Sequence, residues 1–446
     1  MLAKYFSFDE NNTDLKTEFL AGVTIFLATI YIVIVNPIIL SQAGLSFNGV
    51  VTATVLITAI STILMGVYGK NPIVVAPGMG LNAYFTFSVV KGMGVSPEIA
   101  LGTIFWSGII FVILSVTNIR SLIVDAIPKQ IRYAISCGIG LFIALIGLSN
   151  AGFIVSNPAT MISQGMLTCW TITFLIGLMV TSILLIRKTP AALLIGIIIT
   201  TIIAFPIGRY WGDASSFNHN VATLVTWHGF VAMPDFSLIL KLKIIEALKF
   251  IYIPVIFSFL FTDMFDSLST FVGVAEAGNL IDQDGNPRNL KKSLLVDAIS
   301  TLISGLLGSS SGTSYIESAA GINAGGRTGF VAVVTGVLFI PLLFFSPIIS
   351  MIPAIATAPV LVLVGVFMMN PITRINWKNL DDAIPSFLAM FLIPLSYSIT
   401  NGIVWGIISY ILIKFFTGKK SEIRPSLLVI GVFCLISQYY SHFITA

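Results

Sequence analysis

Apolar runs, each close to the length that crosses a bilayer, alternate along this chain with short polar stretches. A helix needs about 20 consecutive apolar residues to span a membrane, so each run predicts a transmembrane helix. Twelve such runs lie near residues 18–41, 48–68, 97–117, 131–149, 168–186, 190–207, 247–276, 292–311, 330–349, 355–370, 383–398 and 400–417. Two shorter, interrupted runs near 72–90 and 312–326 bring the total to about fourteen. A last apolar run, Leu427 to Ile444, fits either a further span or an interfacial helix.

Composition strengthens this interpretation. Of the 446 residues, 56% are hydrophobic and only 9% are charged, and the mean hydropathy is +0.99. These values are far too apolar for a soluble domain, so we predict an all-α polytopic membrane protein. The net charge of +4 is small and its basic residues are spread among short loops, which gives no support for nucleic-acid binding. The cysteines lack metal-ligand spacing and the histidines fall outside the predicted spans, so no metal or other cofactor is expected.

The distribution of Lys and Arg predicts the orientation. With a cytoplasmic N-terminus, all but five of the 23 basic residues fall on the cytoplasmic side, as is the rule for membrane proteins. The five exceptions are Lys91, Arg209, Lys241, Lys243 and Lys249. We therefore predict a multi-pass protein of the cell (inner) membrane with its N-terminus in the cytoplasm. The first apolar run follows an acidic leader without a small-residue cleavage site, so no removable signal peptide is expected.

Two short stretches of the chain echo each other. Residues 76–83 (APGMGLNA) and 317–324 (ESAAGINA) both end in Gly-(Leu/Ile)-Asn-Ala. Such an internal duplication with interrupted helices is typical of transporters whose substrate lies between the repeats. Seven spans precede the second half, so it enters the membrane from the opposite side and the repeats are inverted. We predict the first repeat at 1–207, a polar connector at 208–246, and the second repeat with the C-terminal apolar segment at 247–446.

Four acidic residues lie within apolar stretches: Asp263, Asp266, Asp297 and Glu317. Ionised carboxylates are costly at bilayer depth, so they normally face a cavity or a partner and mark a substrate or ion pathway. Asp263 and Asp266 continue in helical spacing to Ser267 and Thr270, which makes a polar stripe suited to lining water or ligand. The alternative, that a carboxylate only pairs with a polar neighbour to support packing, fits Asp297 better than Asp263 or Glu317.

The two interrupted segments predict unwound backbone near the middle of the membrane. Pro77 does not fit the interior of a helix, and Gly80 allows close backbone approach. In the second half, the small polar run 309–315 precedes Glu317. Unwound backbone is tolerated at this depth only where it lines a cavity, and the half-helices that follow it present free N–H groups. With Asp263 and Glu317 as acceptors, these donors suit a small planar heterocycle that carries ring N–H and carbonyl groups, and they suit a simple anion poorly.

Two further hypotheses concern the ligand and the coupling ion. Phe85 could stack on a planar ligand, although an aromatic side chain in an apolar helix more often only packs. Buried carboxyl groups can exchange protons with the medium, so Glu317, Asp263 and Asp266 are the candidates for proton coupling. Proton-coupled uptake is the expected mechanism, and sodium coupling through the same carboxylates remains open.

The interrupted segments and the acidic helix resemble a known family, the nucleobase:cation symporters of the xanthine/uracil permease superfamily, and within it the AzgA-like adenine, guanine and hypoxanthine permeases. Three stretches carry the likeness: 71–83 (NPIVVAPGMGLNA), 262–279 (TDMFDSLSTFVGVAEAGN) and 308–326 (GSSSGTSYIESAAGINAGG). The likeness runs over nearly the whole chain and implies a seven-plus-seven inverted repeat. It also implies a core domain at about 17–117 and 247–349 and a gate domain at about 131–207 and 355–417.

The resemblance assigns site residues as well. The acidic position of the eighth span falls on Asp263, with Asp266 one turn further along. The acidic position of the tenth span falls on Glu317, and the polar position of the third span falls on Asn82. Uracil carriers of the superfamily have Glu-x-x-x-His in the eighth span, where this chain has Asp263 and Ser267, and this departure favours purines. The predicted substrate-binding residues are Glu317, Asp263, Asn82, Gly80, Ser318 and Phe85.

The leading hypothesis is therefore a proton-coupled secondary importer of purine bases (hypoxanthine, guanine, adenine) that works by alternating access. An anion carrier of the sulfate permease type shares the architecture, but such proteins usually carry a regulatory domain after the last span, where this chain has a short tail. A membrane-embedded enzyme would need signature motifs that are not evident, so no enzymatic activity is expected, and a passive channel would not accumulate its solute. The expected partners are the purine base and the lipid bilayer. The gate helices could also pair in a homodimer, for which the sequence shows no interface signature.

Overall fold

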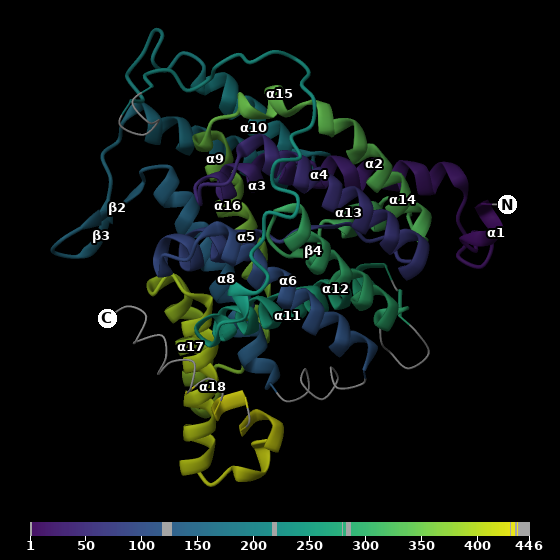
Figure 1. Ribbon diagram of the computed structural model, residues 1–446, viewed down its shortest axis with the longest axis vertical. Coiled ribbons are helices and arrows are strands. Elements are labelled where there is room, and N and C mark those ends of the chain that lie inside the picture. Colours follow the sequence, from purple (N-terminus) through teal and green to yellow (C-terminus); the bar gives the residue numbers. More distant parts are fainter. Residues whose placement is uncertain are drawn as a thin grey trace.

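The apolar runs form helices in the computed structural model, which describes residues 2–117, 127–215, 221–278, 280–281, 287–428, 430–432 and 435 (Figure 1). The helices of the first half are α1 (Leu2–Tyr5), α2 (Leu15–Thr29), α3 (Ile32–Ser41), α4 (Phe47–Leu64), α5 (Met79–Ala83), α6 (Pro97–Val116), α8 (Lys129–Asn150), α9 (Cys169–Ile186) and α10 (Ala192–Ala204). Those of the second half are α11 (Ile253–Gly278), α12 (Leu290–Leu307), α13 (Ser318–Asn323), α14 (Gly329–Phe339), α15 (Ser346–Ser350), α16 (Ala354–Met368), α17 (Leu380–Leu395) and α18 (Ile399–Phe416).

Among the described residues, eight helical segments are long and apolar enough to cross a membrane, which confirms a multi-pass membrane protein. Two further apolar helical segments, Ala192–Ala204 and Gly329–Phe344, are shorter. Polar residues between the runs start several helices. The carboxylate of Asp14 accepts a hydrogen bond from the backbone N–H of Thr17 at 2.7 Å at the start of α2, and this bond lowers the pKa of Asp14 from its usual value.

Four short strands in the described part of the chain depart from the all-α prediction. Strands β1 (Val75–Pro77) and β4 (Gly312–Ser314) pair with each other, and β2 (Ile154–Asn157) forms a hairpin with β3 (Met161–Gln164). Sequence reasoning missed them because three or four residues are too few to show the alternation that marks a strand. The last apolar run, Leu427 to Ile444, lies largely outside the described residues.

The first predicted span is confirmed as one apolar helical segment, Leu15–Ser41, although its α-helical hydrogen bonding is interrupted between α2 and α3. At the break, the backbone N–H of Val33 bonds to the carbonyl of Ile30 at 3.1 Å, so the turn is tighter than an α-helix. Pro37 lies inside α3 and leaves the carbonyl four residues before it, that of Val33, without its helical donor. The break places Tyr31 in the turn between the two helices.

The long helices pack in two groups. The first group consists of α2, α3, α4, α6, α11, α12, α13 and α14, and the second of α8, α9, α10, α16, α17 and α18. Each group therefore contains helices from both halves of the chain, as the sequence colours of Figure 1 show. The first group is called the core below and the second the gate.

The described residues of the connector, 208–246, form an extended segment without a long helix (Figure 1). This segment is bound to the core at several points. The backbone N–H of Asp235 donates to Thr52 Oγ1 at 3.0 Å, and that of Leu240 donates to the carbonyl of Leu306 at 2.8 Å. The connector therefore covers one end of the core instead of hanging free.

The N-terminal segment covers another part of the core. Asn11 accepts a hydrogen bond from Arg288 at 2.6 Å, and the buried carboxylate of Glu18 accepts one from the backbone N–H of Arg327 at 2.7 Å. Lys70 stacks over the ring of Tyr5 at 5.0 Å from its centroid. Three basic residues from three different loops therefore lie at the same end of the core as the N-terminus.

A buried ion cluster joins α17 and α18. Lys414, whose side chain is only 1% exposed, lies 2.6 Å from Asp381, 3.0 Å from Asp382 and 2.6 Å from Glu422. These three carboxylates form the only group in the described part of the chain whose spacing could suit a metal ion. Because the ammonium of Lys414 already pairs with all of them, the cluster is a structural anchor of the gate.

We expect Lys414→Met to lower the free energy of unfolding by about 3 kcal/mol, because it leaves adjacent carboxylates without their buried cation. Thermal unfolding of the detergent-purified protein measures this effect. Lys419→Met is the matched control, since Lys419 pairs with the same Asp381 at 2.6 Å but is 43% exposed and should contribute less than about 1 kcal/mol. Equal losses in the two variants would contradict the anchor role.

Candidate functional site

The two interrupted segments meet in the core through their strands. β1 and β4 run antiparallel, with Val75 opposite Ser314 and Pro77 opposite Gly312. The pairing continues on both sides, since Gly78 donates to the carbonyl of Ser311 at 2.9 Å and Tyr315 donates to that of Val74 at 3.0 Å. The unwound backbone of each half thus satisfies the polar groups of the other, which an apolar environment requires.

Glycine lets the crossed strands lie close to their neighbours. A Cβ on Gly312 would lie 2.0 Å from Ser300 Oγ of α12, and one on Gly78 would lie 2.7 Å from Thr313 Cγ2 of β4. Each strand is followed by a short helix, α5 after β1 and α13 after β4, and α5 continues as a π-helix over Tyr84–Gly92. Both segments are therefore interrupted helices, as their Pro, Gly and Ser content predicted.

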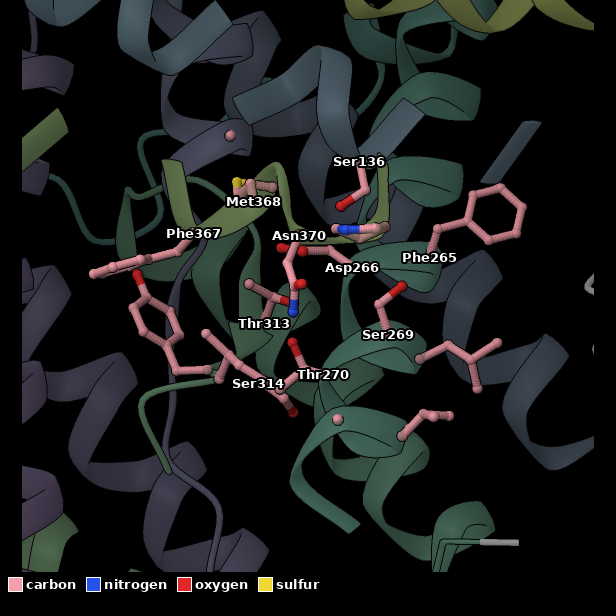
Figure 2. Close-up of a pocket in the computed structure, with 18 of the residues that line it drawn as sticks. Ser136, Phe265, Asp266, Ser269, Thr270, Thr313, Ser314, Phe367, Met368 and Asn370 are labelled. Carbon is pink, nitrogen blue, oxygen red and sulfur yellow. The ribbon is translucent and has the colours of Figure 1, made fainter. Parts of the chain in front are cut away.

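A cavity of about 400 Å³ lies between the crossed strands and α11 on the core side and α8, α16 and the segment after α16 on the gate side (Figure 2). Its volume is in the range of small-molecule sites. The polar lining residues are Tyr31, Lys129, Arg132, Tyr133, Ser136, Asp266, Ser269, Thr270, Thr313, Ser314, Tyr315, Glu317, Asn370 and Arg374. Apolar contacts come from residues including Phe265, Val364, Phe367 and Met368.

Glu317 lies at the start of α13 and lines the cavity. Its Oε1 accepts a hydrogen bond from the hydroxyl of Tyr31 at 2.6 Å. Among the described residues, no other side chain is found to bond the second oxygen, Oε2. One half of this carboxylate is therefore held by the protein, and the other half is available to a ligand.

Asp266 is the second carboxylate of the cavity. It projects from α11 and is partly exposed, and Figure 2 shows it in the group of polar residues that also includes Ser269, Thr270 and Asn370. Within the described parts of the chain, no hydrogen bond to its carboxylate is found. Asp266 and Glu317 together give the cavity two acceptors of N–H groups.

Asp263 lies one turn earlier on α11, and the structure places it behind the cavity rather than in it. Its side chain is completely buried, and its carboxyl group is hydrogen-bonded to the hydroxyl of Thr301 of α12. The same hydroxyl lies 3.0 Å from the carbonyl oxygen of Gly312. The prediction placed this residue in the binding site. In the conformation observed, Asp263 instead supports β4 from behind.

Asp297 supports the same strand. It accepts a hydrogen bond from Ser314 at 2.9 Å and another from Ser267, and Ser267 also bonds Thr313 at 2.9 Å. Buried polar groups need such partners, so the acids of α11 and α12 fix each residue of β4. The alternative that the sequence left open for Asp297, a packing role, agrees with these contacts.

Of the remaining predicted site residues, one lines the cavity and the others are buried in the structure around it. Gly80 lines the cavity, and a Cβ there would lie 2.4 Å from Ile139 of α8, so it marks a close contact of core and gate. Asn82 is buried and accepts a hydrogen bond from Ser310. Ser318 is buried too, and its hydroxyl accepts from the backbone N–H of Val74 at 3.1 Å. Phe85 is fully buried and does not line the cavity.

Sequence reasoning missed several lining residues. Tyr31 is one polar aromatic in a long apolar run, and Ser136 is an isolated hydroxyl in another, so neither gave a signal. Asn370 stands at the end of a predicted span, before Pro371, where a polar residue normally only ends a helix. Phe367, rather than Phe85, brings an exposed aromatic ring to the cavity.

A multi-pass chain in which two interrupted helices meet beside a cavity that contains two carboxylates defines the class of membrane transporters. The particular family follows from comparison with known proteins. The xanthine/uracil permease family, described as "Permease family", matches residues 16–422, and the chain belongs to it. It is a transporter and not an enzyme.

Individual relatives match over nearly their whole length. The adenine permease AdeP of Escherichia coli is 37% identical, with 98% of this chain and 95% of that protein covered. The guanine/hypoxanthine permease PbuO of Bacillus subtilis is 38% identical, with 97% and 99% covered. The transmembrane domain of a cyanobacterium bicarbonate transporter, BicA, has a similar fold, with a TM-score of 0.63 over 88% of this chain and 97% of that one, at 14% identity.

Proposed function

We propose that this protein is a secondary importer of purine nucleobases that couples uptake to protons and works by alternating access. The observation that carries the proposal is the cavity with Glu317 and Asp266 beside the crossed strands, in a chain whose relatives are named adenine and guanine/hypoxanthine permeases. The same cavity contains hydroxyl and amide side chains from both core and gate. It therefore offers acceptors and donors around one space of small-molecule size.

The chemistry of a purine fits this lining. A purine presents ring N–H groups, and in some cases an exocyclic amino group, to the carboxylates Glu317 and Asp266. Its ring nitrogens or oxo group accept hydrogen bonds from hydroxyls such as Ser269 and from the amide of Asn370. Phe367 and Met368 offer apolar surface for the flat ring faces.

The proposed architecture has fourteen spans in two inverted repeats, 1–207 and 247–446, joined by the connector. Its support is that each half contains one strand followed by a half-helix, and that the core and the gate each take helices from both halves. A gate that moves relative to the core would open the cavity to either side in turn. A homodimer through the gate remains part of the proposal.

The proposed orientation has the N-terminus in the cytoplasm. Lys70, Arg288 and Arg327 share the end of the core that the N-terminal segment covers, as expected for a cytoplasmic face. The cavity reaches exposed Lys129 and Arg374, which the same orientation assigns to the cytoplasmic side. The conformation observed would then be open toward the cytoplasm.

Proton coupling is proposed through the acidic residues of the cavity and its support. Glu317 and Asp266 are accessible from the cavity, and Asp263 lies one helical turn from Asp266. A carboxyl group that takes up a proton on one side and releases it on the other would link uptake to the proton gradient. Sodium bound by the same carboxylates is the alternative.

An anion carrier is the second candidate, because BicA shares the fold. That likeness is at 14% identity and therefore concerns the fold alone. The cavity lining holds the basic residues Lys129, Arg132 and Arg374 beside the carboxylates Asp266 and Glu317, so its charge does not decide between the two candidates. The support for the first candidate comes from the relatives at 37–38% identity, which are named adenine and guanine/hypoxanthine permeases. The purine proposal is therefore favoured.

Uptake of radiolabelled hypoxanthine, guanine, adenine and uracil into a transport-deficient cell tests the proposal. We expect saturable purine uptake, no uracil uptake, and loss of accumulation when a protonophore is added. Accumulation that survives the protonophore but requires sodium would show that sodium, and not the proton, is the coupling ion. No purine uptake, with bicarbonate or sulfate taken up instead, would overturn the substrate assignment.

A further inference from the structure

Tyr31 is the only lining residue of the cavity for which a hydrogen bond to a lining carboxylate is found among the described residues. It does not belong to any of the three stretches that resemble the permease family. It stands at the break between α2 and α3, in the first predicted span, whereas Glu317 stands in the tenth. The bond therefore joins the two halves of the chain at the cavity.

The contact is specified by close helix packing. A Cβ on Gly321 of α13 would lie 2.4 Å from Ile25 Cγ1 and 2.7 Å from the carbonyl of Ala21, both on α2. Glycine at this position lets α13 approach α2 closely. This approach, together with the break after α2, puts the hydroxyl of Tyr31 at 2.6 Å from Glu317 Oε1.

The side chain of Tyr31 has no freedom to turn away. It is 1% exposed, and its ring is among the largest fully buried side chains of the core. The nearby Tyr315 cannot take over its role as donor, because the Tyr315 hydroxyl is bound to the carbonyl of Pro77. A phenol O–H donating to a carboxylate is a charge-assisted bond, which is stronger and more directional than a neutral one.

We propose that Tyr31 is a positioning residue for substrate recognition: it holds Oε1 of Glu317 and thereby directs Oε2 toward an N–H group of the base. This inference rests on the proposed function and deepens it, since it assigns the orientation of the main acceptor to a residue of the first span. Without the hydroxyl, Glu317 remains in the cavity but loses its fixed rotamer. Binding of the base must then also order that side chain, and the lost conformational entropy weakens the affinity.

The test uses the Tyr31→Phe variant of the full-length protein, which keeps the buried ring and removes only the hydroxyl. We expect the equilibrium dissociation constants for radiolabelled hypoxanthine, guanine and adenine to rise about tenfold in purified protein, for those bases that the wild type binds. In cells, KM should rise by the same factor with Vmax changed less than about twofold, because Glu317 itself is intact. Unchanged affinity would overturn the inference.

Tyr84→Phe is the matched control for stability. Tyr84 is also fully buried, and its hydroxyl also has a partner, Thr400 at 2.8 Å, but it does not line the cavity. We expect both variants to lose similar thermal stability and only Tyr31→Phe to lose affinity. Equal losses of affinity in Tyr31→Phe and Tyr84→Phe would show that Tyr31 acts only through stability, and would overturn the inference. A wild type that binds no purine would instead overturn the proposed function, so the two failures are distinguishable.

Discussion

Glu317→Gln should abolish the accumulation of purine and lower the affinity for the base by about 10- to 150-fold. Gln keeps the size of the side chain and one carbonyl oxygen for the hydroxyl of Tyr31, so the fold of α13 is retained. What it removes is the charged acceptor at Oε2 and the group that could exchange a proton. Hydrogen bonds to a charged partner contribute about 1.5–3 kcal/mol, which corresponds to this order of loss.

Glu276→Gln is the matched control. Glu276 stands near the end of the same α11 that carries Asp266, but it is about half exposed and pairs with Arg374 at 3.4 Å at the surface. We expect uptake close to that of the wild type, because exposed pairs of this kind contribute little. Normal affinity and normal accumulation in Glu317→Gln, measured at equal expression, would contradict the assignment of the binding site.

Asp266→Asn should lower the affinity for purine about 10- to 100-fold without loss of thermal stability. Asp266 lines the cavity and no hydrogen bond to its carboxylate is found in the described chain, so the amide removes an acceptor that only the ligand uses. Binding of radiolabelled base to purified protein, together with thermal unfolding, measures the two effects separately.

Asp263→Asn is the comparison that separates the two neighbouring acids of α11. Asp263 is buried behind β4 and bonded to Thr301, so its substitution should change the stability of the strand crossing more than the contacts of the base. A larger affinity loss in Asp263→Asn than in Asp266→Asn, at unchanged stability, would show that the eighth-span acid recognised from the sequence is the one that binds. The same pair of variants, assayed for proton-driven accumulation, tests which acid carries the proton.

The amino-acid sequence predicted the helical segments well, because about 20 apolar residues can satisfy their backbone in a membrane only as a helix. The interruptions at β1 and β4 were also predictable, since Pro77, Gly78 and the Ser-rich run before Ser314 disfavour a continuous helix. Glu317 was recognised for a related reason, because a carboxylate in an apolar stretch requires a cavity or a partner.

Helical spacing placed Asp263 and Asp266 on one polar stripe, but it could not determine which of them lines the cavity. That depends on how α12 packs against α11. Thr301 of α12 bonds Asp263 of α11, and Ser267 of α11 bonds Asp297 of α12, so both acids support β4. Phe85 shows the same limit: its place in the third span was evident, but its burial follows from neighbours distant in the sequence. The gate residues Ser136 and Asn370 could be assigned to the cavity only from the structure, because the packing of α8 and α16 against the core brings them there.

The sequence by itself therefore determined that this chain crosses a membrane, that two of its helices are broken, and that Glu317 faces a cavity or a partner. These features follow from local rules, the cost of unpaired backbone and of charge in an apolar medium. Tertiary structure alone decided that Asp266 rather than Asp263 faces the cavity, and that Tyr31 bonds Glu317, which lies 286 positions away in the sequence. Such contacts depend on packing between helices far apart in the sequence, which no local pattern of residues specifies.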